Sequence, residues 1–316
     1  MTAARPPFRF GLLHMRAGAT RRNWCDRARR AESLGFSTFQ VSDHFDRSPT
    51  APLLTLAAVA QATTTIGLGT LVLDNDFRHP AVLAKELATL DVLCDGRLEI
   101  GIGAGWMPAD YAVSGLPFDP PGTRVDKLGE SLAILDAVLA GAGPTTLAGR
   151  HYAVTGLRST PAPVQRPRPP LLVGGARRRV LSLAGRAADI VSVNIDVGEG
   201  RMGERAARSA FADAIDEKLG WVRTAAGDRE PELHLVAYWA QVTERPEEVA
   251  AERIAAAGLG VTPQELLASP HCLIGPRGQL VERLQESRER WGFSYVTLYD
   301  ADAGSLTPVV ADLRGT

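Results

Sequence analysis

The stretch that decides the fold reads Gly96-Arg97-Leu98-Glu99-Ile100-Gly101-Ile102-Gly103-Ala104-Gly105-Trp106. A dinucleotide-binding fold needs a third glycine at a set offset, where a helix begins, and an acid about 20 residues later. Here Trp106 takes the next position, Pro108 follows, and no acid ends a strand at that distance. The stretch therefore predicts a barrel strand over 97–102, whose glycine-rich end lets a flat ligand lie against bare backbone.

Chain length and charge narrow the class of protein. The 316 residues suit a single α/β barrel, which takes about 250 residues plus insertions, so we expect one domain over 1–316. Lysine and arginine total 35 against 36 aspartates and glutamates, so no net field draws the chain to nucleic acid or to an anionic membrane. The partner we expect is a small-molecule substrate.

The spacing of the cysteines and the make-up of the apolar segments indicate in which cellular compartment to expect the protein. Cys25, Cys94 and Cys272 are widely spaced and odd in number, which is not the pattern of a disulfide framework or a thiolate metal site. Residues 1–7 lack the apolar core of a signal peptide, and polar residues and glycines interrupt the longest apolar region, 51–73. We therefore expect a cytoplasmic protein without a membrane span. The sequence also lacks metalloprotease, Walker and serine-hydrolase motifs, and we expect no metal site.

Strand-like and helix-like segments alternate along the chain, which indicates a parallel sheet joined by crossover helices. The helical pattern is strongest over 123–139, where Leu128, Leu132 and Leu135 recur at helical spacing. Eight strands is the number that closes a small barrel, so the fold class we predict is a (β/α)8 TIM barrel. The eight predicted strands are 8–13, 38–42, 65–73, 97–102, 171–174, 190–194, 233–242 and 295–299.

Three segments do not fit the alternation and are predicted to be insertions. The segment 141–170 is rich in glycine and proline and reads as a long connection, because the alternation resumes at Leu171. The other two segments are 197–204 and 259–276. We expect these insertions at the rim of the barrel, on the C-terminal face, where lids and specificity loops occur.

An acid and an imidazole follow the second predicted strand. Asp43 and His44 come just after 38–42, and the active site of a parallel barrel lies at the C-terminal ends of its strands. A carboxylate beside an imidazole holds the ring in one tautomer and gives a proton donor or acceptor that works near neutral pH. The alternative is structural, with Asp43 capping the next turn and His44 on the surface.

Glycines at two further strand ends suggest ligand contact. Those in 67–72 interrupt an apolar strand, which marks either a close backbone approach or tight helix packing. Gly174 and Gly175 end the strand 171–174 just before a helix, and free backbone N–H groups at a helix N-terminus can bind a phosphate. Three arginines follow at 177–179, although a run of charges is usually a solvated face.

Several segments in order resemble the bacterial luciferase-like superfamily of flavin- and deazaflavin-dependent oxidoreductases, and its F420-dependent branch in particular. The resemblance extends from the first strand to about Asn194. The segments that carry it are 31–36, 42–44, 66–70, 84–91, 95–106 and 170–175.

The resemblance implies a ring cofactor lying across the strand ends of the barrel. It implies a non-prolyl cis peptide bond between Leu71 and Val72, in a bulge that backs the ring. It also implies coenzyme F420 as the cofactor, with FMN as the alternative, and a homodimer. The implied cofactor-binding residues are Asp43, Gly69, Thr70, Leu71, Val72, Gly103, Ala104, Gly105, Gly174, Gly175, Ala176 and Arg177.

Position 106 departs from one branch of the superfamily. Relatives that oxidise sugar phosphates carry a glutamate at the position that matches Trp106, so that chemistry is not expected here. Trp106 is instead predicted to cover the ring or to shape an apolar pocket, and packing at the rim is the structural alternative. We count Trp106 with Asp43 and His44 as the catalytic residues.

Three functions agree with these observations. The first is an F420-dependent reductase that delivers hydride to an activated C=C or C=N bond, with His44 giving the proton and Asp43 orienting it. Asp110 and Tyr111 are the fallback proton donors. The second is an FMN-dependent monooxygenase that works with a separate flavin reductase. The third is a flavin-binding relative without catalysis.

Overall fold

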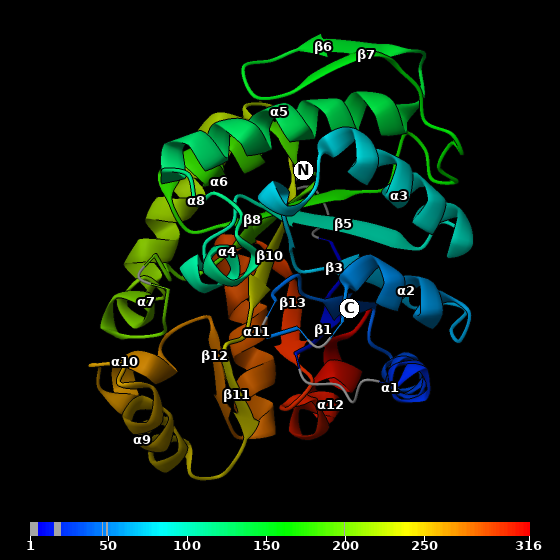
Figure 1. Cartoon of the computed structure of the whole chain (residues 1–316). Coiled ribbons are helices and arrows are strands. Elements are labelled where there is room, and N and C mark those ends of the chain that lie inside the picture. Colours follow the sequence, from blue (N-terminus) through cyan, green and yellow to red (C-terminus); the bar gives the residue numbers. More distant parts are fainter. Residues whose placement is uncertain (1–5, 16–19, 46, 49, 199) are drawn as a thin grey trace.

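Parallel strands close into a barrel in the computed structural model of the chain, which describes residues 6–15, 20–45, 47–48, 50–198 and 200–316 (Figure 1). The sheet closes because β3 pairs with β5 on one side, and β1 pairs with β13 on the other. The predicted (β/α)8 barrel is therefore confirmed. Its eight strands are β1 (Arg9–His14), β2 (Thr38–Val41), β3 (Gly67–Thr70), β5 (Leu98–Gly103), β8 (Leu171–Gly175), β9 (Ile190–Val193), β10 (Glu232–Val236) and β13 (Phe293–Tyr299).

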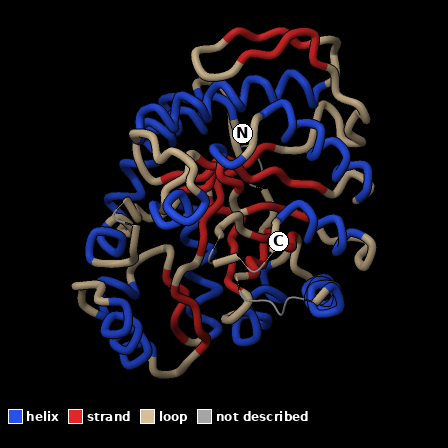
Figure 2. The backbone as a smooth tube through the Cα atoms, viewed as in Figure 1, coloured by secondary structure: helices blue, strands red, loops and turns tan. Residues whose placement is uncertain are grey.

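Helices surround the barrel, as Figure 2 shows with helices in blue around strands in red. The predicted amphipathic helix is observed as α5, where Leu128, Leu132 and Leu135 are all buried. No helix of the described residues is both long and apolar enough to cross a membrane. The helices that follow barrel strands are α1 (Arg21–Ser33), α2 (Pro52–Ala60), α3 (Pro80–Leu93), α5 (Pro121–Ala140), α6 (Arg178–Ala187), α8 (Ala212–Ala226), α11 (Arg277–Trp291) and α12 (Ala303–Leu313).

The predicted strand 65–73 is interrupted near its end. The peptide bond between Leu71 and Val72 is cis, as the resemblance implied, and β3 stops before it. The chain then continues as β4 (Leu73–Asp74), which pairs with β5 rather than with β2. The bulge between the two short strands places Leu71 and Val72 at the C-terminal end of the barrel.

The predicted strand 233–242 is two strands, and only the first belongs to the barrel. β10 ends at Val236, and β11 (Trp239–Val242) pairs with β12 (Cys272–Gly275) in a separate two-stranded sheet. The insertion after β10 therefore covers 237–276 and is larger than the predicted 259–276. It also contains α9 (Pro246–Ala257) and α10 (Pro263–Leu267).

A second small core holds this insertion against the loop after β9. The loop includes most of the predicted insertion 197–204, in which residue 199 lies outside the described residues, and α7 (Glu204–Arg208). Burial of these apolar side chains joins the two insertions into one wall of the barrel rim. The buried members of this core are Ile195, Ala206, Ala207, Ala210, Trp239, Ala250, Leu259, Val261, Leu266, Cys272 and Ile274.

The segment 141–170 lies elsewhere than the sequence analysis expected. It joins α5 to β8, so both of its ends lie toward the N-terminal ends of the barrel strands rather than at the C-terminal face. Its strands β6 (Thr145–Ala148) and β7 (Ala153–Leu157) form an antiparallel hairpin outside α5 (Figure 1). Glu130 of α5 fixes the hairpin turn, because its carboxylate accepts hydrogen bonds from the backbone N–H groups of residues 150–152.

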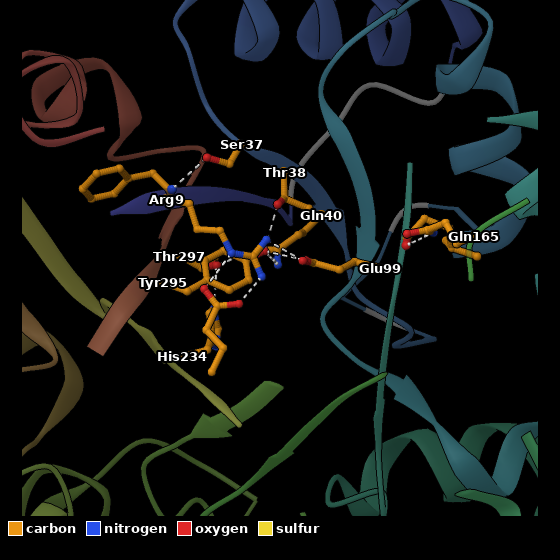
Figure 3. A network of polar contacts seen from close by, with 12 residues as sticks. Arg9, Ser37, Thr38, Gln40, Glu99, Gln165, His234, Tyr295 and Thr297 are labelled. Atoms are coloured by element: carbon orange, nitrogen blue, oxygen red, sulfur yellow. Dashed lines mark hydrogen bonds and ion pairs between the residues drawn. The ribbon is translucent and has the colours of Figure 1, made fainter. Parts of the chain in front are cut away.

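Charged side chains occupy the interior of the barrel near the N-terminal ends of its strands (Figure 3). The Arg9 guanidinium lies 2.5 Å from a Glu99 oxygen and 2.6 Å from a Glu232 oxygen, and 3.7 Å from the ring centroid of Tyr295. The Tyr295 hydroxyl donates to the other Glu99 oxygen at 2.7 Å. Each charge thus has a partner, which interior charges require because burial removes their hydration.

A second polar layer lies between this cluster and the C-terminal face. His234 contacts the Ser192 hydroxyl through Nδ1 at 2.7 Å and the Thr297 hydroxyl through Nε2 at 2.8 Å. Thr297 donates to Gln40, which donates to Tyr295 (Figure 3). Burial lowers the pKa of His234 well below its usual value, so the ring is neutral.

We expect Gly101→Ala to destabilise the protein by about 1–3 kcal/mol. A Cβ at Gly101 would lie 1.9 Å from the Thr70 carbonyl oxygen, and backbone cannot move aside as a flexible side chain can. Gly220→Ala in the middle of α8 is the control, because nothing lies within 4 Å of its added Cβ and alanine favours helix. Urea unfolding measures both variants, and a Gly101→Ala protein as stable as the wild type would contradict the packing described.

Candidate functional site

A cavity of about 590 Å³ opens at the C-terminal ends of the barrel strands. Its lining comes from the ends of several strands, from the bulge after β3 and from the loops after β5, β8 and β9. Of the predicted site residues, those that line the cavity are Asp43, His44, Leu71, Val72, Gly103, Ala104, Gly105, Trp106, Gly174, Gly175, Ala176 and Arg177.

Gly69 and Thr70 were predicted to contact the cofactor, but they are absent from the lining of this cavity. Gly69 lies inside the barrel, where an added Cβ would be 3.3 Å from Gln40. The buried Thr70 hydroxyl donates to the Gly101 carbonyl at 2.7 Å and accepts from the Gly101 N–H at 3.0 Å. The two residues therefore fix the start of the bulge from below.

His44 is held by a carboxylate on a different element from the one expected. Its Nδ1 lies 2.6 Å from Oδ2 of Asp110, which belongs to the short helix α4 (Pro108–Ser114) and is almost completely buried. The backbone N–H of Phe45 donates to the other Asp110 oxygen at 3.0 Å. With Nδ1 engaged, Nε2 is the nitrogen that a bound molecule can reach.

Asp43 has another role from the one predicted. Its carboxylate accepts two hydrogen bonds from the Arg78 guanidinium, at 2.5 and 3.1 Å, and one from the backbone N–H of Asp74 at 3.2 Å. Asp43 therefore ties the end of β2 to the segment that follows the bulge. Asp43 is next to His44 in the sequence, but the carboxylate that contacts and orients the His44 ring is that of Asp110.

Trp106 packs against His44 at the edge of the cavity. The two ring centroids are 5.6 Å apart and the ring planes are nearly perpendicular. Gly105 before it has φ +72°, and an added Cβ would lie 2.0 Å from the Tyr111 hydroxyl oxygen. Arg124 of α5 donates to the carbonyls of Ala104 and Gly105, which fixes this turn.

Asp74 is a lining residue that the sequence analysis did not single out. The Tyr111 hydroxyl lies 3.1 Å from both of its carboxyl oxygens, and the backbone N–H of Asp76 donates to one of them. Burial, together with the negative charges of Asp76 and Asp43, raises the pKa of Asp74 to about 7. Near neutral pH, this wall of the cavity therefore holds a carboxyl group that is partly protonated.

The loop between β8 and α6 offers backbone N–H groups to an anion. Gly174 and Gly175 end β8, and α6 begins at Arg178, so its first N–H groups have no helical partners, and residues 174–177, 179 and 180 line the cavity. Gly175 leaves no room for a side chain, because an added Cβ would be 2.3 Å from Val180. The Arg177 guanidinium pairs with Asp196 at 3.1 Å across this end of the cavity.

Asn194 was also missed, although it ends a predicted strand. Its Oδ1 lies 3.1 Å from the Ser192 hydroxyl oxygen and accepts a hydrogen bond from the Tyr238 hydroxyl at 3.4 Å. Its Nδ2 lies over Gly174, 3.0 Å from the position of an added Cβ. Its position at the end of a predicted barrel strand could have identified it, because the C-terminal ends of barrel strands carry functional side chains. Among the described residues, no group of His, Cys, Asp or Glu is arranged to hold a metal ion.

We expect Asp74→Asn to change how stability depends on pH. An unfolded aspartate ionises near pH 4, so between about pH 4 and pH 7 the folded wild type binds more protons and loses stability as pH rises. The variant has no carboxyl group at position 74 and lacks this loss. The free energy of unfolding of Asp74→Asn minus that of the wild type should therefore be larger at pH 7.5 than at pH 4.5, by at least about 1 kcal/mol.

Urea unfolding at the two pH values measures this difference. Asp213→Asn, at an exposed position in the first turn of α8, is the control and should follow the wild type at both pH values. A difference between Asp74→Asn and the wild type that stays constant with pH would show that the Asp74 carboxyl is already ionised at pH 4.5.

The chain is similar to known proteins over part or nearly all of its length. The chain is 32% identical over 176 residues to an F420-dependent glucose-6-phosphate dehydrogenase of Amycolatopsis mediterranei, an alignment that covers 53% of this chain and 52% of that protein. The chain thus spans about half the length of the curated relatives it matches.

Solved structures share the fold over nearly the whole chain. The monooxygenase RslO1 from Streptomyces bottropensis superposes with a TM-score of 0.74 at 20% identity, covering 96% of this chain and 98% of that one. An F420-dependent secondary alcohol dehydrogenase in complex with an F420-acetone adduct gives a TM-score of 0.76 at 18% identity, covering 98% and 99%. The family described as luciferase-like monooxygenase matches residues 7–295, so the chain belongs to the luciferase-like family.

Proposed function

We propose that the chain is an F420-dependent oxidoreductase that delivers hydride from reduced F420 to an activated C=C or C=N bond of a small organic substrate. The observation that carries this proposal is the His44 and Asp110 pair, which stands at the cavity beside the cis peptide bulge. The similarity to F420-dependent dehydrogenases supports F420 as the cofactor.

The residues present fit a flat ring with a phosphate-bearing side chain. Val72 of the bulge and the backbone at Gly103 and Gly174 would hold the ring, and Gly103 lets Val72 lie close to β5 because an added Cβ would be 2.9 Å from Val72. The first N–H groups of α6 would hold the phosphate. When bound, reduced F420 supplies the hydride.

The protein's own contribution to this reaction is the control of a proton. Asp110 holds Nδ1 of His44, so Nε2 can carry a proton and release it to the substrate atom next to the one that receives hydride. Trp106 packs on the imidazole and keeps water from that side of the ring. Asp43 acts indirectly, since its ion pair with Arg78 anchors the chain after the bulge.

A second candidate is an FMN-dependent monooxygenase that works with a separate flavin reductase. The family description and the shared fold of the monooxygenase RslO1 favour it. Both functions would use the same cavity, and the cofactor distinguishes them.

Titration with each cofactor tests the proposal. We expect F420 to bind with quenching of its fluorescence, and to bind more tightly than FMN. Boiled protein provides the blank, and an unrelated protein of similar charge provides the control for nonspecific quenching. Tight FMN binding without any response to F420 would contradict the F420 proposal and favour the monooxygenase.

Substitutions at His44 and Asp110 test the proton-transfer pair. His44→Ala should lower turnover by about 10²–10⁴-fold with little change in cofactor affinity, because it removes the proton donor and leaves the bulge and α6 intact. Asp110→Asn should lower turnover less, because the imidazole remains but loses the carboxylate that holds Nδ1. Unchanged turnover in His44→Ala would contradict the role of His44 and favour Asp74 or Tyr111 as the proton source.

A further inference from the structure

A second hollow of about 600 Å³ lies on the outside of the barrel, between α5, α6 and the β6–β7 hairpin. Figure 1 shows the hairpin beyond α5, with α6 on the barrel side. On the α5 side the hollow is lined by the small residues Gly129 and Ala133, and a Cβ added at Gly129 would lie 3.7 Å from Leu183 of α6. We call this hollow the α5–α6 groove.

The α5–α6 groove is continuous with the cavity at the strand ends. Val125 and Arg179 line both hollows, so they form the boundary between them. Arg179 lies in the first turn of α6, beside the N–H groups proposed to hold a phosphate. A ligand whose phosphate is held there can therefore extend directly into the groove.

Arginines line the groove on two sides. Arg179 and Arg186 are seven residues apart on α6, about 10 Å along the same face of the helix, and Arg150 comes from the hairpin. Arg179 pairs with the exposed Asp126. The structure gives no hydrogen bond or ion pair for the side chains of Arg150 and Arg186 with any other described residue.

The acidic residues of the groove are already compensated. The Glu130 carboxylate accepts from the N–H groups of residues 150, 151 and 152, which lowers its pKa and offsets its charge. The pairing of Asp126 with Arg179 likewise leaves no acid without a partner among the described lining residues. Two exposed guanidinium groups thus remain available to an anion that bears more than one charge.

We propose that the α5–α6 groove binds the oligoanionic extension of the cofactor, a chain of carboxylates that continues beyond the phosphate. This inference rests on the proposed function. Coenzyme F420 carries an oligoglutamyl chain beyond its phosphate, whereas FMN ends at the phosphate. The groove would therefore add affinity for F420 that FMN cannot gain, and Arg150 and Arg186 would determine the preference between the two.

Binding measurements on the full chain test the groove. Dissociation constants are measured by fluorescence quenching for FMN, for an F420 species without glutamate and for F420 with several glutamates. We expect the wild type to bind F420 more tightly as the chain lengthens. The double variant Arg150→Glu with Arg186→Glu should weaken binding of the long form by about tenfold or more and leave FMN binding within about twofold.

Arg22→Glu is the matched control, because Arg22 is a 90% exposed arginine on α1 and lines neither hollow. It should bind all three ligands as the wild type does. Wild-type affinity that does not depend on the number of glutamates overturns the groove proposal while leaving F420 as the cofactor. Unchanged binding of the long form by the double variant also overturns it. Binding of FMN without binding of any F420 species overturns both the groove and the proposed cofactor.

Discussion

The site depends on the close approach of Thr70 at the end of β3 to Gly101 in the middle of β5. The Thr70 hydroxyl bonds both the carbonyl and the N–H of Gly101, and only glycine fits, since an added Cβ would lie 1.9 Å from the Thr70 carbonyl. Because β3 ends here, the chain forms the bulge at Leu71 and Val72 and restarts as β4 against β5. The glycines of the stretch 96–106 thus make room for the bulge that forms the cavity wall.

Polar groups in the barrel interior and polar groups at its C-terminal face have different roles. In the interior, the partly buried Arg9 cluster and the buried His234 layer are held by hydrogen bonds and ion pairs, so they fill the barrel and link its strands. At the C-terminal face, His44, Asp74 and the N–H groups of α6 face a cavity, where they can act on a ligand. Leu13 and Val236, which line the cavity and pack in one apolar cluster, separate the two regions.

Periodic and glycine-rich segments made the barrel predictable, whereas contacts between distant residues did not follow from sequence. The spacing of Leu128, Leu132 and Leu135 predicts α5 because a helix repeats its buried face at that interval. By contrast, the apolar pattern over 233–242 does not reveal that the chain leaves the barrel after Val236. The partner of His44 was assigned to its neighbour Asp43, because the fold alone brings Asp110 to the ring from 66 residues away.

The central claim is that a ring cofactor binds between the bulge and the glycine loops, with its reactive edge toward His44. A crystal structure of the protein with F420 measures this most directly. The account predicts density for the ring against Val72 and Gly174, and the phosphate at the first turn of α6. Density for the ring on another face of the barrel, or with its reactive edge turned away from His44, would contradict it.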